Sequence, residues 1–483
     1  MLATPFRSAK ELAADIRRKK IGCLELLDLY LSRVDKHNPA LNAIIVTDVE
    51  GARKRARAAD RALARKQVWG PLHGVPMTIK ECFNVVGMPS TWGIPALKDN
   101  VPPRNAVVVD RLLGAGAVLF GKTNVPMFLA DYQSYNSIYG TTNNPWDLSR
   151  SPGGSSGGSA AALASGLTGI ETGSDIGSSV RNPAHYCGVY GHKTTFGIVP
   201  ERGHTFGRVA GADINVVGPM GRSAEDLELG LAVTAGPDEI DAAGYKLTLR
   251  APRQKALRDF KVAVMLTDPN SEVDAEVLDR IQAVAEFLAK KRAKVSDTAR
   301  PDVDTGKAQR TYIYLLRSAT SLRQTDEEFE RNVQIARGLS AGDQSYYAQM
   351  MRANTGSHRD LLAVNETRHQ MRRKWAEFFK EYDLLLCPAA ASAAFPHDQQ
   401  GERWERTIEV NGHRVPTTDQ LFWAGYSGMS YLPSTVAPAG LTKSGLPVGV
   451  QIIGPQYGDR TCIQLARLLE REYQGFVPPP DYV

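Results

Sequence analysis

The stretch between Arg150 and Glu171 contains no charged residue, and it constrains the fold more than any other feature of the chain. It is about as long as a membrane-spanning helix, which needs ~20 consecutive apolar residues. Its sequence, SPGGSSGGSAAALASGLTGI, consists mainly of glycine, serine and alanine and is too weakly apolar for lipid. Small residues instead allow backbones to approach each other closely. The stretch therefore predicts a closely packed segment of a globular protein.

Two glycine-rich, charge-poor loops contain serines, namely SPGGSSGGSAA around Ser155 and GSDIGSSVRNP around Ser179. Each glycine adds to the entropic cost of ordering a loop, so such loops usually mark a close approach of the backbone to a ligand. Two tight turns in a sheet protein are the alternative explanation for either motif alone. We therefore treat both loops as candidate ligand-binding segments.

Short apolar runs alternate with helical patterns along the whole chain, and this alternation is typical of an α/β protein with helices layered on a sheet. With 483 residues, of which 42% are apolar, the chain can form a large core. The segment at about 256–382 is more polar and helical, so we expect it to decorate the sheet rather than form a separate domain. Strands are expected at 43–46, 75–80, 117–122, 262–266, 384–387 and 448–453, and helices at 8–20, 23–37, 106–113, 274–291 and 463–472.

The positive charge of the chain is concentrated in one segment. Residues 53–66 contain seven lysine and arginine side chains and one aspartate, a net charge of +6 that equals the net charge of the whole protein. A basic stripe can bind nucleic acid or an acidic membrane. The alanine-rich spacing here instead favours a solvated helix face, so we expect neither a nucleic-acid partner nor a membrane partner.

The cysteines and the N-terminal residues suggest a compartment. Five cysteines, an odd number without CxxC spacing, indicate neither a disulfide framework nor a zinc site. Charged residues interrupt the N-terminal segment before an apolar run long enough for a signal peptide. We therefore expect a cytoplasmic protein. The cysteines are Cys23, Cys82, Cys187, Cys387 and Cys462.

Two short motifs match known patterns but stand in the wrong context. Residues 116–123 fit GxxxxGK[ST], yet the four middle residues form a strand and no helix can start at the lysine, so a phosphate loop is disfavoured. Residues 153–157 fit GxSxG, the nucleophile elbow of α/β-hydrolases. That motif needs an apolar strand directly before it and a later histidine, whereas loop residues precede it here and no histidine has a distinctive setting. A Ser-His mechanism remains the alternative for this loop.

Several segments together resemble the amidase signature family of hydrolases. SPGGSSGGSAAALASG and GSDIGSSVRNPAHYCGVYGHKTT resemble its serine-rich signature, and PLHGVPMTIKECFNVVGMPSTWG resembles its lysine strand. GAGAVLFGKTNVPMF and LPVGVQIIGPQYGD resemble further strands of the family. The resemblance extends from about residue 8 to residue 472. It implies an α/β fold in which residues 1–483 form a single large domain, with a central mixed sheet flanked by helices on both sides.

The resemblance also implies the catalytic residues, matched by motif. The lysine that ends VPMTIK is Lys80, the first serine of GGSSGG is Ser155, and the serine before Val-Arg is Ser179. In the family these three act as base, proton relay and nucleophile, and the peptide bond before the relay serine is cis. Backbone N–H groups of Ile176, Gly177, Ser178 and Ser179 are the implied oxyanion donors. No metal or organic cofactor is implied.

Two positions depart from the family pattern. Ser178 stands where the family usually has glycine, and Glu81 follows the lysine where the family usually has aspartate. Ser178 restricts the backbone of the nucleophile turn but keeps an N–H group, so an oxyanion hole survives if the φ angle there suits a serine.

The chemistry of such a site requires a neutral lysine. A serine hydroxyl becomes a good nucleophile only when a base takes its proton. The pKa of Lys80 must then fall by roughly 3 units from about 10.4 for the amine to be neutral at pH 7. Burial has this effect, and the apolar strand before Lys80 supplies a low-dielectric environment.

The family resemblance predicts a hydrolase that cleaves a carboxylic amide through a serine acyl-enzyme and releases ammonia or an amine, with esters, ureas and carbamates as further substrates. A small-molecule amide is the expected partner, and a homodimer is plausible. The alternative is a glutamine-hydrolysing subunit of a tRNA-dependent amidotransferase complex. Aromatic residues near the expected pocket favour an apolar or aryl substrate; they are Tyr132, Tyr135, Phe422, Trp423 and Tyr426.

Overall fold

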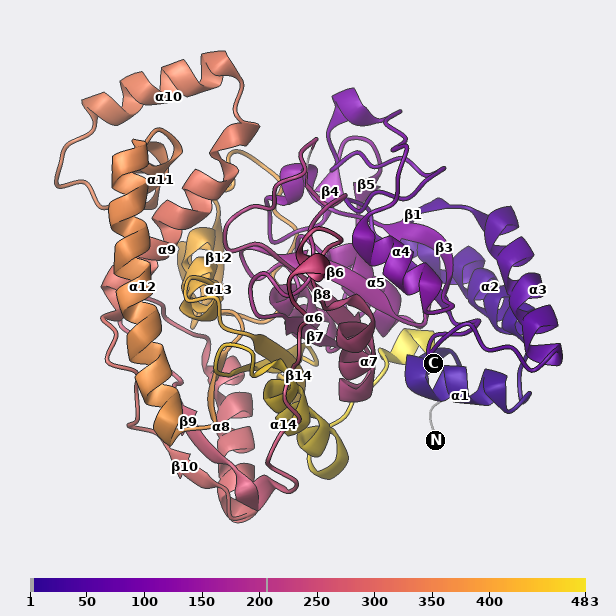
Figure 1. Cartoon of the computed structure of the whole chain (residues 1–483). Helices are drawn as coiled ribbons and strands as arrows, with labels where there is room; N and C mark the ends of the chain where they lie inside the picture. The colour runs from indigo at the N-terminus through magenta and orange to yellow at the C-terminus, as the bar shows by residue number, and fades with distance from the viewer. Residues whose placement is uncertain (1–3, 206) are drawn as a thin grey trace.

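An eight-stranded mixed sheet forms the centre of the protein in the computed structural model, which describes residues 4–205 and 207–483 (Figure 1). Strands β9, β10 and β11 are parallel, and every other neighbouring pair is antiparallel. This confirms the predicted α/β fold with a mixed sheet. In spatial order the strands are β10 (Lys294–Ser296), β9 (Lys261–Val264), β11 (Leu384–Pro388), β15 (Pro447–Ile453), β14 (Ser434–Leu441), β7 (Tyr190–Lys193), β8 (Val216–Gly221) and β6 (Glu171–Asp175).

Three of the predicted strands form a second, three-stranded sheet. Its central strand β3 (Val118–Thr123) pairs in parallel with β2 (Pro76–Lys80) and antiparallel with β1 (Ile44–Thr47). Strand β2 lies beside β6, the edge strand of the large sheet. The Gly169 N–H donates to the Pro76 carbonyl (3.1 Å), and the Thr78 hydroxyl donates to the Glu171 carboxyl (2.5 Å). The two sheets are thus joined by buried contacts along β2 and β6.

Helices cover both faces of the large sheet, as strand β7 shows. A Cβ at Gly191 would lie 2.9 Å from Ala184 in helix α6 (Arg181–Cys187), whereas the next side chain, His192, bonds Asp459 in helix α14 (Asp459–Glu472) at 3.1 Å. Successive residues of a strand point to opposite faces. Helices α6 and α14 therefore lie on opposite sides, as predicted.

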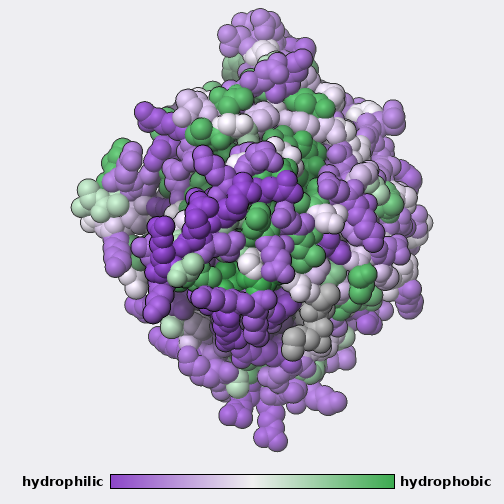
Figure 2. All heavy atoms as spheres, turned by 90° about the vertical axis from the view of Figure 1, so that its right-hand side faces the viewer, coloured by the Kyte–Doolittle hydropathy of each residue, from purple (hydrophilic) through white to green (hydrophobic). Residues whose placement is uncertain are grey.

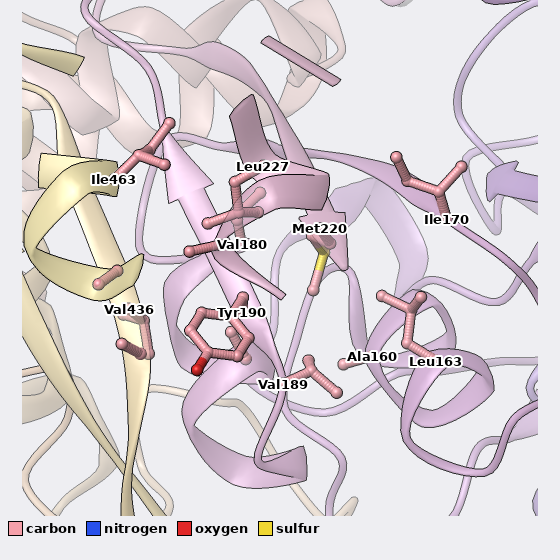
Figure 3. Close-up of a cluster of buried hydrophobic side chains, with 14 of the residues drawn as sticks. Ala160, Leu163, Ile170, Val180, Val189, Tyr190, Met220, Leu227, Val436 and Ile463 are labelled. Carbon is pink, nitrogen blue, oxygen red and sulfur yellow. The ribbon is translucent and has the colours of Figure 1, made fainter. Parts of the chain in front are cut away.

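The charge-free stretch lies in the interior. All of residues 151–170 are buried, and they include helix α5 (Gly157–Ala164). A Cβ at Gly154 would lie 2.3 Å from the Asp131 carbonyl, and one at Gly158 would lie 2.4 Å from the Asn124 nitrogen, so glycine alone permits these close approaches. Ala160 and Leu163 of α5 belong to the apolar cluster in Figure 3. The predicted close packing is confirmed.

The segment 256–382 forms a helical layer at one side of the molecule (Figure 1) and also supplies strands β9 and β10 of the large sheet. Tyr312, in α9, reaches the neighbourhood of the candidate site by donating to the Ile176 carbonyl (2.9 Å). The helices are α8 (Ala275–Lys290), α9 (Thr305–Thr320), α10 (Asp326–Gly338), α11 (Tyr346–Asn354) and α12 (His358–Glu381).

The basic segment is helix α3 (Val49–Ala64), which packs on α2 (Cys23–Leu41) near the N-terminal helix α1 (Ala9–Arg17). Four alanines of α3 are buried, and most of its basic side chains are exposed or half-buried. Figure 2 shows this side of the molecule, where hydrophilic side chains dominate. Among the described residues, none of the helices has the length and apolar character needed to cross a membrane. The remaining longer helices are α4 (Val107–Gly114), α7 (Ala224–Thr234) and α13 (Leu421–Gly428).

Candidate active site

Lys80 ends strand β2 and lies between the two serine loops. Its side chain is fully buried. The ammonium nitrogen Nζ donates to Ser155 Oγ (2.7 Å), to Ser174 Oγ (2.9 Å) and to the Ser174 carbonyl (3.3 Å). Because all three contacts come from the loop before α5 and from β6, the lysine joins the small sheet to the large one.

The electrostatic setting of Lys80 favours a neutral amine. Burial lowers its pKa from 10.5 to about 8, and the acidic groups nearby oppose this shift only in part. Desolvation penalises the charged form of an amine, which is the effect that the sequence required of this position. A substantial fraction of the amine is therefore neutral slightly above physiological pH.

Ser155 and Ser179 lie in two loops that are hydrogen-bonded to each other. The Gly154–Ser155 peptide bond is cis, as the resemblance implied. The N–H of Ser156 donates to the Ser179 carbonyl (3.1 Å), which ties the loops together. Ser155, Ser174 and Ser179 line one cavity, which we call the serine cavity. The structure thus brings together Lys80, Ser155 and Ser179 from three separate segments.

Asp175 organises the turn that presents Ser179. Its carboxylate accepts the N–H groups of Ser178 (2.9 Å), Val180 (3.1 Å) and Arg181 (3.3 Å). It also accepts two guanidinium bonds from Arg181, at 2.8 and 3.0 Å. Burial would raise the pKa of Asp175, but the Arg181 guanidinium outweighs it and the pKa falls to about 2. Asp175 is therefore ionised and holds the backbone of the turn in place.

The same network changes the expected oxyanion hole. Because the Ser178 N–H donates to Asp175, it does not point at a substrate, and its predicted role as an oxyanion donor is wrong for this geometry. The N–H groups of Ile176, Gly177 and Ser179 make no hydrogen bond within the part of the chain that the structure describes. The Tyr312 hydroxyl holds the Ile176 carbonyl at 2.9 Å. These three N–H groups are the remaining candidates.

Ser178 adopts the left-handed conformation with φ of +77°, and its buried hydroxyl has no partner among the described residues. A left-handed non-glycine residue costs roughly 1–2 kcal/mol. We expect Ser178→Gly to raise the free energy of unfolding by about 1 kcal/mol, since the gain in the folded state exceeds the added entropy of an unfolded glycine. Thermal unfolding by calorimetry measures this change. Ser178→Ala is the matched control, because it removes the hydroxyl and keeps the strained φ; a less stable Ser178→Gly protein would contradict the prediction.

The aromatic residues expected at the pocket are mostly elsewhere. Of the five, Tyr132 lines a cavity beside Ser179. Phe422, Trp423 and Tyr426 are buried in the main hydrophobic core, and Tyr135 accepts a hydrogen bond from Arg406 (2.9 Å). Their expected role at the pocket is thus wrong for all but Tyr132, because α13 turns its aromatic residues into the core. Glu81, which stands where the family usually has aspartate, accepts hydrogen bonds from the backbone N–H groups of two loop residues, Thr91 and Trp92.

One histidine, His204, lines the serine cavity. Burial, and then the charge of Lys80, lowers its pKa to about 3, so the ring is neutral. Neither ring nitrogen has a hydrogen-bond partner among the residues described. His185 and His192 are buried in bonds to Gly449 and Asp459, away from the cavity. Within the described ranges, no serine of this site is therefore paired with a histidine.

Several residues around the site could not be assigned from the sequence. Ser174 bonds Lys80, and Asp175 with Arg181 brackets Ser179 within the same motif. The spacing of Asp175 and Arg181, six positions apart on either side of Ser179, could have indicated this ion pair. Arg317, Arg323 and Arg403, which lie beside Ser179, carried no such signal.

Comparisons with known proteins agree with this geometry. The family model described as Amidase matches residues 25–463. An acylamidase from Rhodococcus erythropolis is 34% identical over 472 residues, which cover 96% of this chain and 94% of that protein. A glutamyl-tRNA(Gln) amidotransferase subunit from Anaeromyxobacter sp. (strain K) is 32% identical, with 98% and 97% covered. A solved bacterial aryl acylamidase of the amidase signature family superposes with a TM-score of 0.80 at 25% identity, covering 97% of this chain and 96% of its own.

These matches define the class, and the chain belongs to the amidase family. It is accordingly an enzyme that hydrolyses carboxylic amides. The resemblance seen in the serine-rich motifs is confirmed.

Proposed function

We propose that Lys80, Ser155 and Ser179 form the catalytic set of this amidase, with Ser179 as nucleophile. The observation that carries the proposal is the 2.7 Å bond from Lys80 Nζ to Ser155 Oγ, made by a buried lysine whose pKa is lowered to about 8. A neutral amine at this distance accepts the Ser155 proton. Ser155 lines the same cavity as Ser179 and is then the group that accepts the proton of the Ser179 hydroxyl.

In the acylation step, Ser179 Oγ attacks the amide carbon. Its proton passes to Ser155, and the Ser155 proton passes to Lys80. The negative oxygen of the tetrahedral intermediate accepts the N–H groups of Ile176, Gly177 and Ser179. The C–N bond then breaks, and Ser155 protonates the leaving nitrogen while Lys80 returns its proton to Ser155.

In the deacylation step, water attacks the ester carbon of the acyl-enzyme. Its proton follows the same path through Ser155 to Lys80, and Ser179 leaves as the free serine after regaining a proton. Every proton in the cycle is therefore held by substrate, water or one of these three side chains.

The substrate we propose has an apolar or aryl part. The cavity beside Ser179 has apolar walls from Leu316, Leu421, Tyr132 and Ile176. Two proteins similar to this chain are named acylamidase and aryl acylamidase. We also propose that the enzyme is cytoplasmic and forms a homodimer. The five cysteines are free and buried, which fits a reducing compartment such as the cytoplasm.

A substrate panel tests the function. We expect primary amides and anilides with apolar or aryl groups to release ammonia or amine, measured directly, at rates well above those of ureas and carbamates. Ser179→Ala protein, purified in parallel, controls for contaminating amidases. If the protein hydrolysed glutamine but none of the other amides, and did so only in the presence of a second subunit, this result would contradict the proposal and favour the amidotransferase alternative.

A further inference from the structure

A second cavity adjoins the serine cavity and shares with it Leu129, Ile176, Ser179 and Arg323. Its lining includes Gly177 and the proposed nucleophile, Ser179. It is also lined by Arg317 near the end of α9, by Arg323 in the 3-10 turn that follows α9 (Ser321–Arg323), and by Arg403 from the segment after β11, so we call it the arginine cavity. Three guanidinium groups therefore surround a space that opens onto the reacting serine.

Arg317 has an unusual environment for a cation. Its side chain is 9% exposed. Within the described part of the chain its guanidinium makes neither a hydrogen bond nor an ion pair, and Nε is buried without a partner. Its one recorded contact of this kind is with the ring of Tyr346, 5.3 Å from the guanidinium carbon. A buried charge without a partner is costly, so such a group is retained where a ligand supplies the partner.

The other two arginines are held in place but not neutralised. Arg323 donates to the Phe128 carbonyl (2.7 Å) and Arg403 donates to the Ala130 carbonyl. Burial, and then the charges of Arg403 and Arg323, lowers the pKa of Arg317. The acidic residue in the lining, Asp131, is 2.7 Å from Arg406 and is thus already paired. The cavity keeps an excess of positive charge.

We infer that the arginine cavity binds a carboxylate at the far end of the substrate, with Arg317 as its main partner and Arg323 and Arg403 beside it. A planar guanidinium matches a carboxylate with two parallel hydrogen bonds. The apolar residues Leu316, Leu421 and Tyr132 contact the part of the substrate between the carboxylate and the amide. This inference rests on the proposed function and narrows its substrates to amides that combine an apolar or aryl part with a carboxylate.

Matched substrates test the charge preference. On the acyl side we compare adipamic acid with 6-methylheptanamide, in which an isopropyl group replaces the carboxylate, and on the amine side 4-acetamidobenzoate with 4-isopropylacetanilide. We expect wild-type kcat/KM to favour the carboxylate of at least one pair by about 30-fold or more, since a charged hydrogen-bonded pair supplies that much discrimination. Arg317→Met should reduce this ratio to nearly 1, and Arg317→Lys should keep part of it. The control Arg337→Met, on exposed α10, should leave the ratio unchanged.

A binding measurement separates this inference from the catalytic proposal. In Ser179→Ala protein, which lacks the proposed nucleophile, adipate and 4-aminobenzoate are added and the melting temperature is followed. We expect at least one of them to raise it, and the shift to disappear when Arg317→Met is added. A shift without amide hydrolysis in the wild type would overturn the proposed function and support the site. Hydrolysis with equal rates for both members of each pair, or a larger shift with inorganic phosphate than with any carboxylate, would overturn the inference.

Discussion

Replacement of Ser179 by alanine is expected to reduce kcat/KM for any amide substrate by roughly 10⁴-fold or more, because no acyl-enzyme can form. The residual rate would come from substrate binding and the N–H groups of Ile176 and Gly177. Ammonia or amine release measures the loss. Fragmentation mass spectrometry of wild-type protein treated with a fluorophosphonate should locate the adduct on Ser179 itself, since Ser155 and Ser179 lie in one stretch without lysine or arginine between Arg150 and Arg181.

The neighbouring serine provides the control for this experiment. Ser178 stands next to Ser179 in the same turn, and its hydroxyl is buried without a partner among the described residues. Ser178→Ala protein should still form the fluorophosphonate adduct. An adduct on Ser155 instead, with Ser179→Ala still labelled, would return the nucleophile-elbow mechanism to consideration.

Replacement of Lys80 by methionine is expected to lower the acylation rate by several orders of magnitude, since the path from Ser179 through Ser155 then has no base. In the wild type, kcat/KM should rise with pH as the ammonium of Lys80 loses its proton. Because the pKa of Lys80 is lowered to about 8, the half-maximal rate should fall near pH 8 and not near 10.5. The pH dependence of single-turnover acylation measures both effects. Ser155→Ala should also be impaired, and the two losses should be far from additive because both residues serve one proton path.

Lys122 is the matched control for Lys80. It lies on the adjacent strand β3, is fully buried, and has a pKa that burial lowers to about 8. Its Nζ donates to Ser90 Oγ (2.7 Å) and the Pro89 carbonyl (2.5 Å), not to the serine loops. Lys122→Met protein that folds should therefore keep the rise in rate near pH 8. If Lys80→Met retained near-normal rates while His204→Phe were inactive, a Ser-His mechanism would replace the one proposed.

The sequence was most informative where one short segment contains a complete feature. Lys80 ends a strand that could be read from its apolar residues, and Ser155 and Ser179 stand in motifs long enough to match a family. The orientation of the Ser178 N–H could not be read in this way, because it depends on which backbone groups Asp175 accepts. That choice is made by the three-dimensional turn.

The arginines of the arginine cavity could not be identified from the sequence for another reason. Arg317 lies on an amphipathic helix, and its sequence neighbours do not distinguish it from the exposed arginines of α10 and α12. It becomes unusual only because chain segments far apart in sequence meet around it. The aromatic residues of α13 show the opposite case: apolar residues close to an expected pocket are more often core, and Phe422 and Trp423 are.

The division of the strands between two sheets bears on how the active site assembles. The base is the last residue of β2 in the small sheet, whereas Ser174 lies in β6 at the edge of the large sheet and the turn with Ser179 follows that strand. Each sheet completes its own backbone ladder without the other, and the Thr78–Glu171 bond forms only when the two edges meet. The active site therefore lies at the contact between the two sheets. Because Lys80 of the small sheet bonds Ser155 and Ser174 only when the two sheets are docked, enzymatic activity reports the contact between the sheets as well as the integrity of each one.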